Sequence, residues 1–313
     1  MIRPYINAWC IAALWLMGCM HCMAYPTAIS VAQDGSGDFR TIQQAIEATK
    51  AFPDRPITIS IGPGIYLEKV RVPHWNTYLT LRGAGVEQTV IQWDDHFQRI
   101  NRGRNSTFYT ATVTIEADDF YAEDLSIKNT AGPVGQAIAL SVLGNRVSFQ
   151  RVHIEGFQDT LYLAGENHRI RFSQSTISGS VDFIFGAASA IFEQCQIHSR
   201  ARGYVTAAST PAKAAFGFVF MDSIFTADPG VTDVYLGRPW RDYANVSVMS
   251  SHLGAHIQPA GWNDWNRETT HTRARLWEFN NRGPGAEVSN RVEWSRQLTS
   301  DQAEQLKSLL NND

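Results

Sequence analysis

A short strand-like pattern recurs through the middle of this 313-residue chain, and its spacing limits the possible folds more than any other feature. The copies are YAEDLSIKN, FQRVHIEG, FSQSTISG, FEQCQIHS, FMDSIFTA and MSSHLGAH. Aligning Ile127, Ile154, Ile177, Ile197, Phe225 and Leu253 gives steps of 27, 23, 20, 28 and 28 residues. Repeats of this length, in which apolar and polar residues alternate, indicate a solenoid built from strands.

Helical repeats and βαβ units are disfavoured because no long segment with helical periodicity separates the copies. A parallel β-helix accounts for the pattern, since each coil packs only on its neighbours and together the coils bury one continuous core. We therefore predict an all-β chain. ITISIGPGIYLEKVRV and TYLTLRGAG, earlier in the sequence, extend the series as strands broken by glycine turns.

One short helix is expected at the N-terminal end of the solenoid and another near the C-terminus. DFRTIQQAIEATK places Ile42, Ala45 and Ile46 on one face and is predicted to cap the open first coil. SDQAEQLKSLL, with Ser300 as its N-cap, is predicted to pack over the outside or the far end. No linker rich in Pro, Ser and Gly interrupts the chain, so a single domain over residues 25–313 is expected rather than two separate β-domains.

The first 24 residues have the organisation of a secretory signal peptide. Arg3 precedes the apolar run AWCIAALWLMGCM, and Ala24 stands at the expected cleavage point. The run is too short for a transmembrane span. A buried N-terminal helix is one alternative, and a lipid anchor at Cys19, in the sequence LMGC, is another. We expect a secreted, extracellular protein.

Charge and cysteine content exclude several classes of function. The net charge of −3 shows no basic face, so nucleic-acid binding is not expected. Cys195 is the one cysteine after the leader, so no internal disulfide is expected, and a buried structural thiol is predicted. The nine histidines show no metal-binding spacing, so a metal site is not expected.

Two aspartates occupy equivalent positions in consecutive copies of the repeat. Asp159 and Asp182 each follow an aligned Phe by ten residues and an aligned Ile by five. Adjacent parallel strands are about 4.8 Å apart, so the two carboxylates are expected to lie one above the other. Carboxylates that close cannot both ionise freely, so we predict that one pKa is raised and that the other stays low. A purely structural ladder of polar side chains is the alternative.

Other residues could complete a catalytic site around this pair. Gln158 directly precedes the first aspartate and Gln136 lies in the loop half of the preceding coil, and amide donors suit a developing oxyanion. Arg238 could bind a carboxylate in fork geometry, and Trp240 offers a flat face to a sugar ring. Each residue alone also has an ordinary explanation: a surface amide, a surface ion pair or an aromatic that covers the core.

Eight blocks of the sequence follow one another along the chain: GDFRTIQQAI, GIYLEKV, STFYTATV, NTAG, QAIAL, GFQDTLY, GSVDFIFG and LGRPW. These blocks, in this order, resemble those of the pectin methylesterases (pectinesterases). The resemblance runs from about Val31 to Trp265 and implies that the β-helix is right-handed. VTAASTPAKAAFGFVF is more similar to the bacterial or insect type of the family than to the plant type.

The resemblance also implies roles for individual residues. These are Asp182 as nucleophile, Asp159 as acid/base, Gln136 and Gln158 as oxyanion donors, Arg238 as the residue that orients the nucleophile, Trp240 as a substrate-stacking residue and Thr107 as a residue near the substrate. The implied reaction removes methyl esters from the C6 carboxyl of homogalacturonan (pectin) and releases methanol through an acyl-enzyme. We expect the enzyme to act as a monomer without a cofactor.

Other functions share parts of this pattern. A retaining glycosidase also uses two carboxylates about 5 Å apart, but it creates reducing ends. A polysaccharide lyase usually needs an acidic calcium-binding cluster, which the sequence does not show. A non-catalytic solenoid would bind pectin without turnover, and an esterase acting on another ester or thioester is the remaining alternative.

Overall fold

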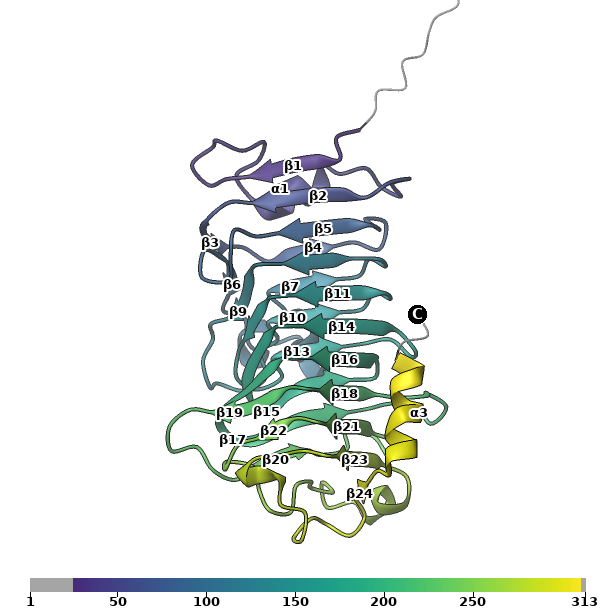
Figure 1. Ribbon diagram of the computed structural model, residues 1–313. Helices are drawn as coiled ribbons and strands as arrows, with labels where there is room; N and C mark the ends of the chain where they lie inside the picture. Colours follow the sequence, from purple (N-terminus) through teal and green to yellow (C-terminus); the bar gives the residue numbers. More distant parts are fainter. Residues whose placement is uncertain (1–24, 311–313) are drawn as a thin grey trace, which may run out of the picture.

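The computed structural model describes residues 25–310, which wind into a right-handed parallel β-helix (Figure 1). Equivalent strands of successive coils pair in parallel and stack along the axis, as the repeat pattern predicted. One face is a sheet of eleven strands. In spatial order these are β1 (Ala28–Val31), β2 (Ile57–Ile61), β5 (Leu79–Arg82), β8 (Tyr121–Glu123), β11 (Val147–Gln150), β14 (Arg169–Ser173), β16 (Ser189–Glu193), β18 (Phe218–Met221), β21 (Asn245–Met249), β23 (Arg275–Phe279) and β24 (Arg296–Gln297).

The second sheet is branched and supplies the rest of each coil. One arm contains β3 (Gly64–Leu67), β6 (Thr89–Trp93), β9 (Ser126–Asn129) and β12 (His153–Glu155). The other arm contains β4 (Val70–Val72), β7 (Val113–Ile115), β10 (Leu140–Val142) and β13 (Leu161–Leu163). The long strand β15 (Thr176–Gly186) pairs with the last strand of each arm and with the long strand β17 (Gln196–Ala208). Beyond them, β17 pairs with β19 (Ile224–Ala227) and β20 (Val234–Gly237), and β19 pairs with β22 (His252–Leu253).

The register of the coils is the one that the sequence alignment predicted. The six aligned apolar residues from Ile127 to Leu253 are direct partners across successive strands. A second ladder consists of Phe149, Phe172, Phe192 and Phe220, whose successive ring centroids are 4.6, 5.1 and 4.6 Å apart. Both ladders belong to one core cluster that extends from Ile29 to Leu276. Differences in coil length therefore arise between these paired positions and do not shift them.

One corner of the coil carries a residue with positive φ in each of seven successive turns. These residues are Asp124, Arg151, Gln174, Gln194, Asp222, Ser250 and Asn280. The residue that follows is buried in six of the seven turns: Leu125, Val152, Ser175, Cys195, Ser223 and Ser251. Ser223 Oγ accepts from the backbone N of Cys195, and Ser251 Oγ accepts from the backbone N of Ser223, both at 3.1 Å. Cys195 therefore belongs to a row of residues linked by these hydrogen bonds. Its thiol is buried, and burial raises the pKa of that thiol to about 12. The prediction of a buried structural thiol is confirmed.

The N-terminal helix α1 (Ile42–Glu47) is shorter than the segment predicted for it, but it buries the predicted face. The Thr41 hydroxyl accepts a hydrogen bond from the Gln44 backbone and begins the helix. Ile42, Ala45 and Ile46 are buried, and the helix packs against β1, β2 and β4 at the first coils (Figure 1).

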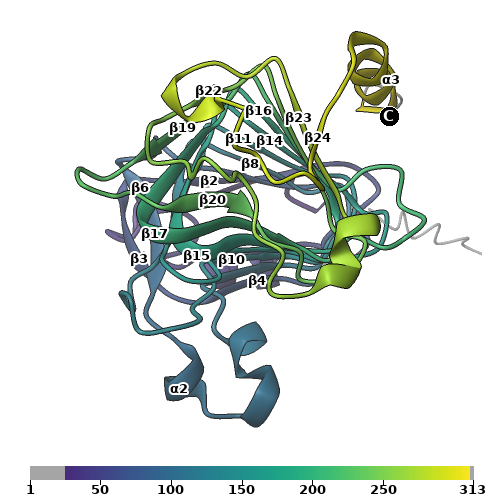
Figure 2. The same cartoon turned by 90° about the horizontal axis from the view of Figure 1, so that it is seen from below.

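The C-terminal helix α3 (Ser300–Leu310) lies along the outside of the eleven-stranded sheet (Figures 1 and 2). Its buried residues Ala303, Leu306 and Leu310 cluster with apolar side chains that include Ile191 and Val219. The prediction of Ser300 as the N-cap is wrong by one residue.

The capping residue of α3 is Thr299. Its hydroxyl accepts from the Gln302 backbone N at 3.3 Å, while Gln302 Oε1 accepts from the Thr299 backbone N at 3.0 Å. This reciprocal pair forms a capping box, so both flanking backbone donors are satisfied and Ser300 is free to be the first helical residue.

Four short helical segments lie in the loops that connect the strands. These are α2 (Phe97–Ile100), η1 (Gly103–Tyr109), η2 (Glu268–Thr272) and η3 (Pro284–Ala286). Figure 2 shows the segment around α2 projecting from the side of the coil.

Residues 1–24, to which the signal-peptide prediction applies, lie outside the described part of the chain. Within residues 25–310 there is no helix of sufficient length and hydropathy to cross a membrane, and no cluster of His, Cys, Asp or Glu that could hold a metal ion.

Candidate active site

All the residues that the sequence singled out as site residues line one cavity of about 280 Å³. The cavity lies where β15 and β17 turn from one arm of the branched sheet into the other. Its lining consists of Arg104, Thr107, Phe108, Gln136, Gln158, Asp159, Asp182, Phe185, Ala207, Arg238, Trp240 and Trp265. These residues come from coils that are distant in sequence, so the stacking of the solenoid is what assembles the site.

The two aspartates occupy adjacent coils in the predicted register. Asp159 N donates to Val181 O at 3.0 Å, and just beyond, Leu161 pairs with Ile184. Both aspartates have a positive φ, 60° for Asp159 and 51° for Asp182. Left-handed backbone at a residue with a side chain costs on the order of 1–3 kcal/mol, which Asp tolerates better than most residues. The side chains of the two aspartates therefore do not follow the regular inward and outward alternation of a β-strand.

Arg238 holds Asp182 in fork geometry. Its Nε donates to Asp182 Oδ1 at 2.8 Å and its Nη2 donates to Oδ2 at 2.7 Å. Arg238 follows β20, and its backbone N donates to Thr206 O. A Cβ at Gly237 would lie 1.9 Å from Thr206 Oγ1, so glycine is required for the close approach of β20 to β17. The predicted pairing of arginine and carboxylate is present.

Burial raises the pKa of both carboxyls, by more at Asp159 than at Asp182. Burial raises the pKa of Asp159 well above its ordinary value, the nearby Asp182 charge raises it further, and Arg238 opposes both effects. Burial also raises the pKa of Asp182, although the hydrogen bonds and the charge of Arg238 act against it. The prediction that one pKa stays low is therefore wrong for Asp182, because the sequence pattern carried no information about its burial.

Gln136 and Gln158 also lie on adjacent coils. They form an isolated parallel bridge, in which Ala137 N donates to Gln158 O at 3.1 Å. Thr107 reaches the same cavity from η1, which is fixed by Thr110: the Thr110 hydroxyl donates to Thr107 O and accepts from Ile138 N. This connection ties the projecting segment to the coil that carries the amides.

Trp240 closes another side of the cavity. Its backbone N donates to Ala208 O at the end of β17. Its ring meets the Phe185 ring edge-on, with centroids 5.9 Å apart. The two aromatics give the cavity an apolar wall opposite the charged groups.

Sequence reasoning missed several residues of the lining. Phe185 could have been found, because alternation from the inward-facing Ile184 directs it to the opposite face of β15. Trp265, at the end of the region of family resemblance, also lines the cavity. Arg104 and Phe108 lie on the projecting segment, where no periodic pattern gives a direction.

The fold and the cavity define a class of protein: a β-helical hydrolase with paired carboxylates, one of them held by arginine, and neighbouring amides. The family model described as Pectinesterase matches residues 28–309. The chain belongs to the pectinesterase family.

Individual relatives agree with this assignment. Pectinesterase 31 of Arabidopsis thaliana is 35% identical over 290 residues, which cover 90% of each chain. A putative pectinesterase/pectinesterase inhibitor 38 of the same plant is 38% identical over 85% of this chain but only 58% of its own length.

Solved structures show the same fold. Pectin methylesterase from carrot superimposes with a TM-score of 0.83 at 33% identity, covering 89% of this chain and 90% of the carrot chain. A pectin methylesterase in complex with a hexasaccharide has a TM-score of 0.79 at 30% identity, covering 91% of this chain and 97% of that chain. The curated relatives named here are plant proteins, whereas one sequence block led us to expect the bacterial or insect type; that subdivision stays a prediction.

Proposed function

We propose that this chain is a pectinesterase that hydrolyses the C6 methyl ester of galacturonate units in pectin and releases methanol. The observation that carries the proposal is the cavity in which Arg238 binds Asp182 while Asp159 lies on the adjacent coil. A buried carboxylate that arginine keeps ionised can act as a nucleophile, and the carboxyl whose pKa is raised further can act as the proton donor. The two groups needed for ester cleavage thus face one space.

In the first half of the reaction, an ionised Asp182 oxygen attacks the ester carbonyl carbon. The carbonyl π electrons move to its oxygen, and the side-chain amides of Gln136 and Gln158 donate hydrogen bonds to that oxyanion. One well-placed donor of this kind is worth about 3–4 kcal/mol in other enzymes. When the tetrahedral intermediate collapses, the bond to the methoxy oxygen breaks and the Asp159 proton goes to the departing methanol.

In the second half, Asp159 is ionised and acts as a base. It removes a proton from a water molecule, whose oxygen attacks the acyl carbonyl of the intermediate. The bond to Asp182 breaks, the galacturonate carboxyl is released, and Asp159 again carries a proton. Trp240 and Thr107 are assigned to substrate contact in this scheme, because both line the cavity beside the reacting groups.

The deciding experiment is product analysis with highly esterified pectin and the purified protein. Methanol release with unchanged polymer length is expected. New reducing ends would instead indicate a glycosidase, an ultraviolet-absorbing unsaturated product would indicate a lyase, and binding without any product would indicate a non-catalytic solenoid. Methanol release from pectin that is slower than hydrolysis of another ester or thioester would overturn the choice of substrate.

We also propose that the mature protein is secreted and acts as a monomer outside the cell. The leader-like sequence of residues 1–24 supports export, and a lipid anchor at Cys19 is the alternative. Mass spectrometry of the protein recovered from an expressing cell distinguishes the two, because cleavage after Ala24 leaves an unmodified chain that starts at Tyr25. Light scattering of that protein tests the monomer.

A further inference from the structure

The guanidinium group of Arg238 is covered on both faces by aromatic rings. Its central carbon lies 3.9 Å from the centroid of the Tyr204 ring and 3.6 Å from that of the Trp265 ring. The edge of the same group donates both hydrogen bonds to Asp182. Two stacked rings fix the plane of a guanidinium group, and that plane sets the direction of its donors.

The position of Tyr204 follows from an irregularity in β17. Ser199 pairs with Gly179, but the next pair along joins Tyr204 to Val181, so β17 contains three more residues than β15 in this interval. The bulge brings Tyr204 beside Val181, directly before Asp182 in the sequence. On its other side Tyr204 pairs with Tyr235, and the two rings stack with centroids 5.4 Å apart.

Trp265 reaches the opposite face of the guanidinium group from a loop that is docked on β20. Trp262 bridges to Gly237, and Asn263 N donates to Gly237 O. The Asn263 side chain then accepts from Trp265 N at 2.8 Å, which holds Trp265 in a left-handed conformation with φ of 57°. Trp265 lines the cavity, so it contacts the substrate space as well as Arg238.

Tyr204 differs from Trp265 because it does not line the cavity. Resting on the function proposed above, we propose that Tyr204 is a positioning residue, which holds Arg238 in the plane that orients Asp182 for attack. Its ring face performs this role, since no hydrogen bond of its hydroxyl connects it to Arg238 or Asp182. The reaction scheme thereby gains a residue that acts on Asp182 through Arg238.

Loss of the ring has two consequences. Without one of its two stacked aromatic rings the guanidinium group can rotate and no longer orients Asp182. Misplacement of a reacting group by about 1 Å can reduce the rate up to a hundredfold. The fork to Asp182 also weakens, so less positive charge opposes protonation of that carboxyl. The charged groups that line the cavity with Asp182 are Asp159, Arg238 and Arg104, and only Arg238 contacts Tyr204.

The test compares Tyr204→Leu with Tyr204→Phe, which keeps the ring and removes only the hydroxyl. In Tyr204→Leu we expect kcat for methanol release to fall about tenfold or more while KM stays within about twofold, because Tyr204 does not line the cavity. The acidic limb of the pH–rate profile should move to higher pH. Tyr204→Phe should restore the wild-type kcat and profile. Tyr235→Leu, which removes a ring from the same row without touching Arg238, is the matched control and should lower kcat much less.

Carbon-13 NMR titration of the Asp182 carboxyl in the same proteins separates this inference from the proposed function. The expected result is a midpoint at least about half a unit higher in Tyr204→Leu than in the wild type and in Tyr204→Phe. If the wild type releases no methanol, the proposed function fails, and the titration still decides whether Tyr204 controls the arginine. An unchanged midpoint in Tyr204→Leu overturns the inference, as does an equal loss of kcat in Tyr235→Leu or in Tyr204→Phe.

Discussion

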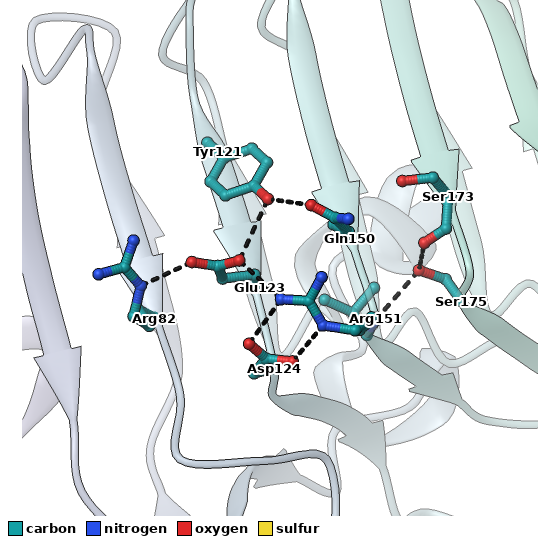
Figure 3. Close-up of polar contacts among 9 residues, drawn as sticks. Arg82, Tyr121, Glu123, Asp124, Gln150, Arg151, Ser173 and Ser175 are labelled. Carbon is teal, nitrogen blue, oxygen red and sulfur yellow. Dashed lines mark hydrogen bonds and ion pairs between the residues drawn. The ribbon is translucent and has the colours of Figure 1, made fainter.

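Two ion pairs in this molecule are built alike and behave differently. Asp124 and Asp182 both have a positive φ, and each accepts two hydrogen bonds of 2.7–2.8 Å from one arginine, Arg151 and Arg238 respectively. Figure 3 shows the first pair within a surface network in which Arg151 also donates to Glu123. The pKa of Asp124 is lowered, chiefly by its hydrogen bonds with Arg151, whereas that of Asp182 is raised by burial.

Access to water explains the difference. The Asp124 and Arg151 side chains are 32% and 41% exposed, but the Asp182 and Arg238 side chains are only 9% and 17% exposed. Water solvates the ionised form of the exposed carboxylate, and arginine adds to that stabilisation. At the cavity the same arginine contact only partly offsets the loss of water. Fork geometry therefore identifies a paired carboxylate, and burial decides whether that carboxylate is poised for chemistry.

The largest expected effect is a difference in kcat between variants of Asp182 and Asp124. Asp182→Asn removes the nucleophile and should lower kcat by a factor on the order of 10⁴ or more, as loss of a covalent nucleophile does elsewhere. Asp124→Asn, at the other pair, should leave kcat within about twofold, since the site does not use it. Methanol release by both variants gives the comparison. Comparable losses would mean that the exposed pair also supports the reaction, and substantial activity in Asp182→Asn would exclude the proposed nucleophile.

A conservative change at the two arginines should have a smaller effect, again at one pair only. Arg238→Lys replaces the planar fork with a point charge and removes the stacking on Tyr204 and Trp265, so kcat should fall roughly 10–100-fold. Arg151→Lys should leave kcat unchanged. The pH–rate profile is the second readout, because the acidic limb of Arg238→Lys should lie at higher pH. If Arg238→Lys retained full activity, a charge alone would be sufficient at this position.

The third prediction concerns stability and depends on the sign of the Asp159 pKa shift. The pKa of Asp159 is raised in the folded state, so the protonated form favours folding. Its contribution is fully present below the unfolded-state pKa, near 3.8, and is lost as pH rises towards the folded-state pKa, at up to about 1.4 kcal/mol per pH unit. Asp159→Asn stays neutral, so it should be inactive yet more stable than the wild type at neutral pH.

Denaturant unfolding of both proteins across the pH range measures this difference. The gain in the free energy of unfolding of Asp159→Asn should grow as pH rises above 3.8 and then level off. Asp124→Asn is the control with the opposite sign, because it removes a carboxylate whose pKa is lowered and should destabilise the protein at neutral pH. A constant difference at all pH values would show that Asp159 does not titrate as described.

The smallest effect is expected from Arg151→Ala. This side chain is 41% exposed, and exposed ion pairs typically contribute no more than about 1 kcal/mol. The free energy of unfolding should therefore fall by about 1 kcal/mol or less, and the loss should shrink in high salt. A loss of several kcal/mol would show that the network in Figure 3 acts as a cooperative unit.

The register of the solenoid could be predicted because strand side chains alternate with a period of two and every coil must present the same ladder to its neighbours. Alignment of Ile154 with Ile177 therefore also placed Asp159 on the coil next to Asp182. The chemistry of arginine suggested Arg238 as a partner of the carboxylates, and the resemblance to a known family supplied its specific role and Thr107, neither of which periodicity could place.

The remainder of the site depends on features that have no periodic signal in the sequence. Tyr204 reaches Arg238 because of a bulge, and Trp265 because of a turn held by Asn263. Arg104 enters from a projecting segment. The raised pKa of Asp182 depends on how completely the surrounding loops exclude water, which is a property of the assembled coil and not of any one segment.

The unequal coil lengths have a consequence for how such a molecule can change. Steps of 20 to 28 residues keep the aligned side chains paired, so additions lie in the connections or in a bulge such as the one in β17. A foreign peptide grafted after β19, between Ala227 and Val234, would enlarge one loop and leave the rungs on either side unshifted. Individual loops can therefore change in length, and alter the surface of the molecule, while the distance between its two reactive carboxyls is conserved.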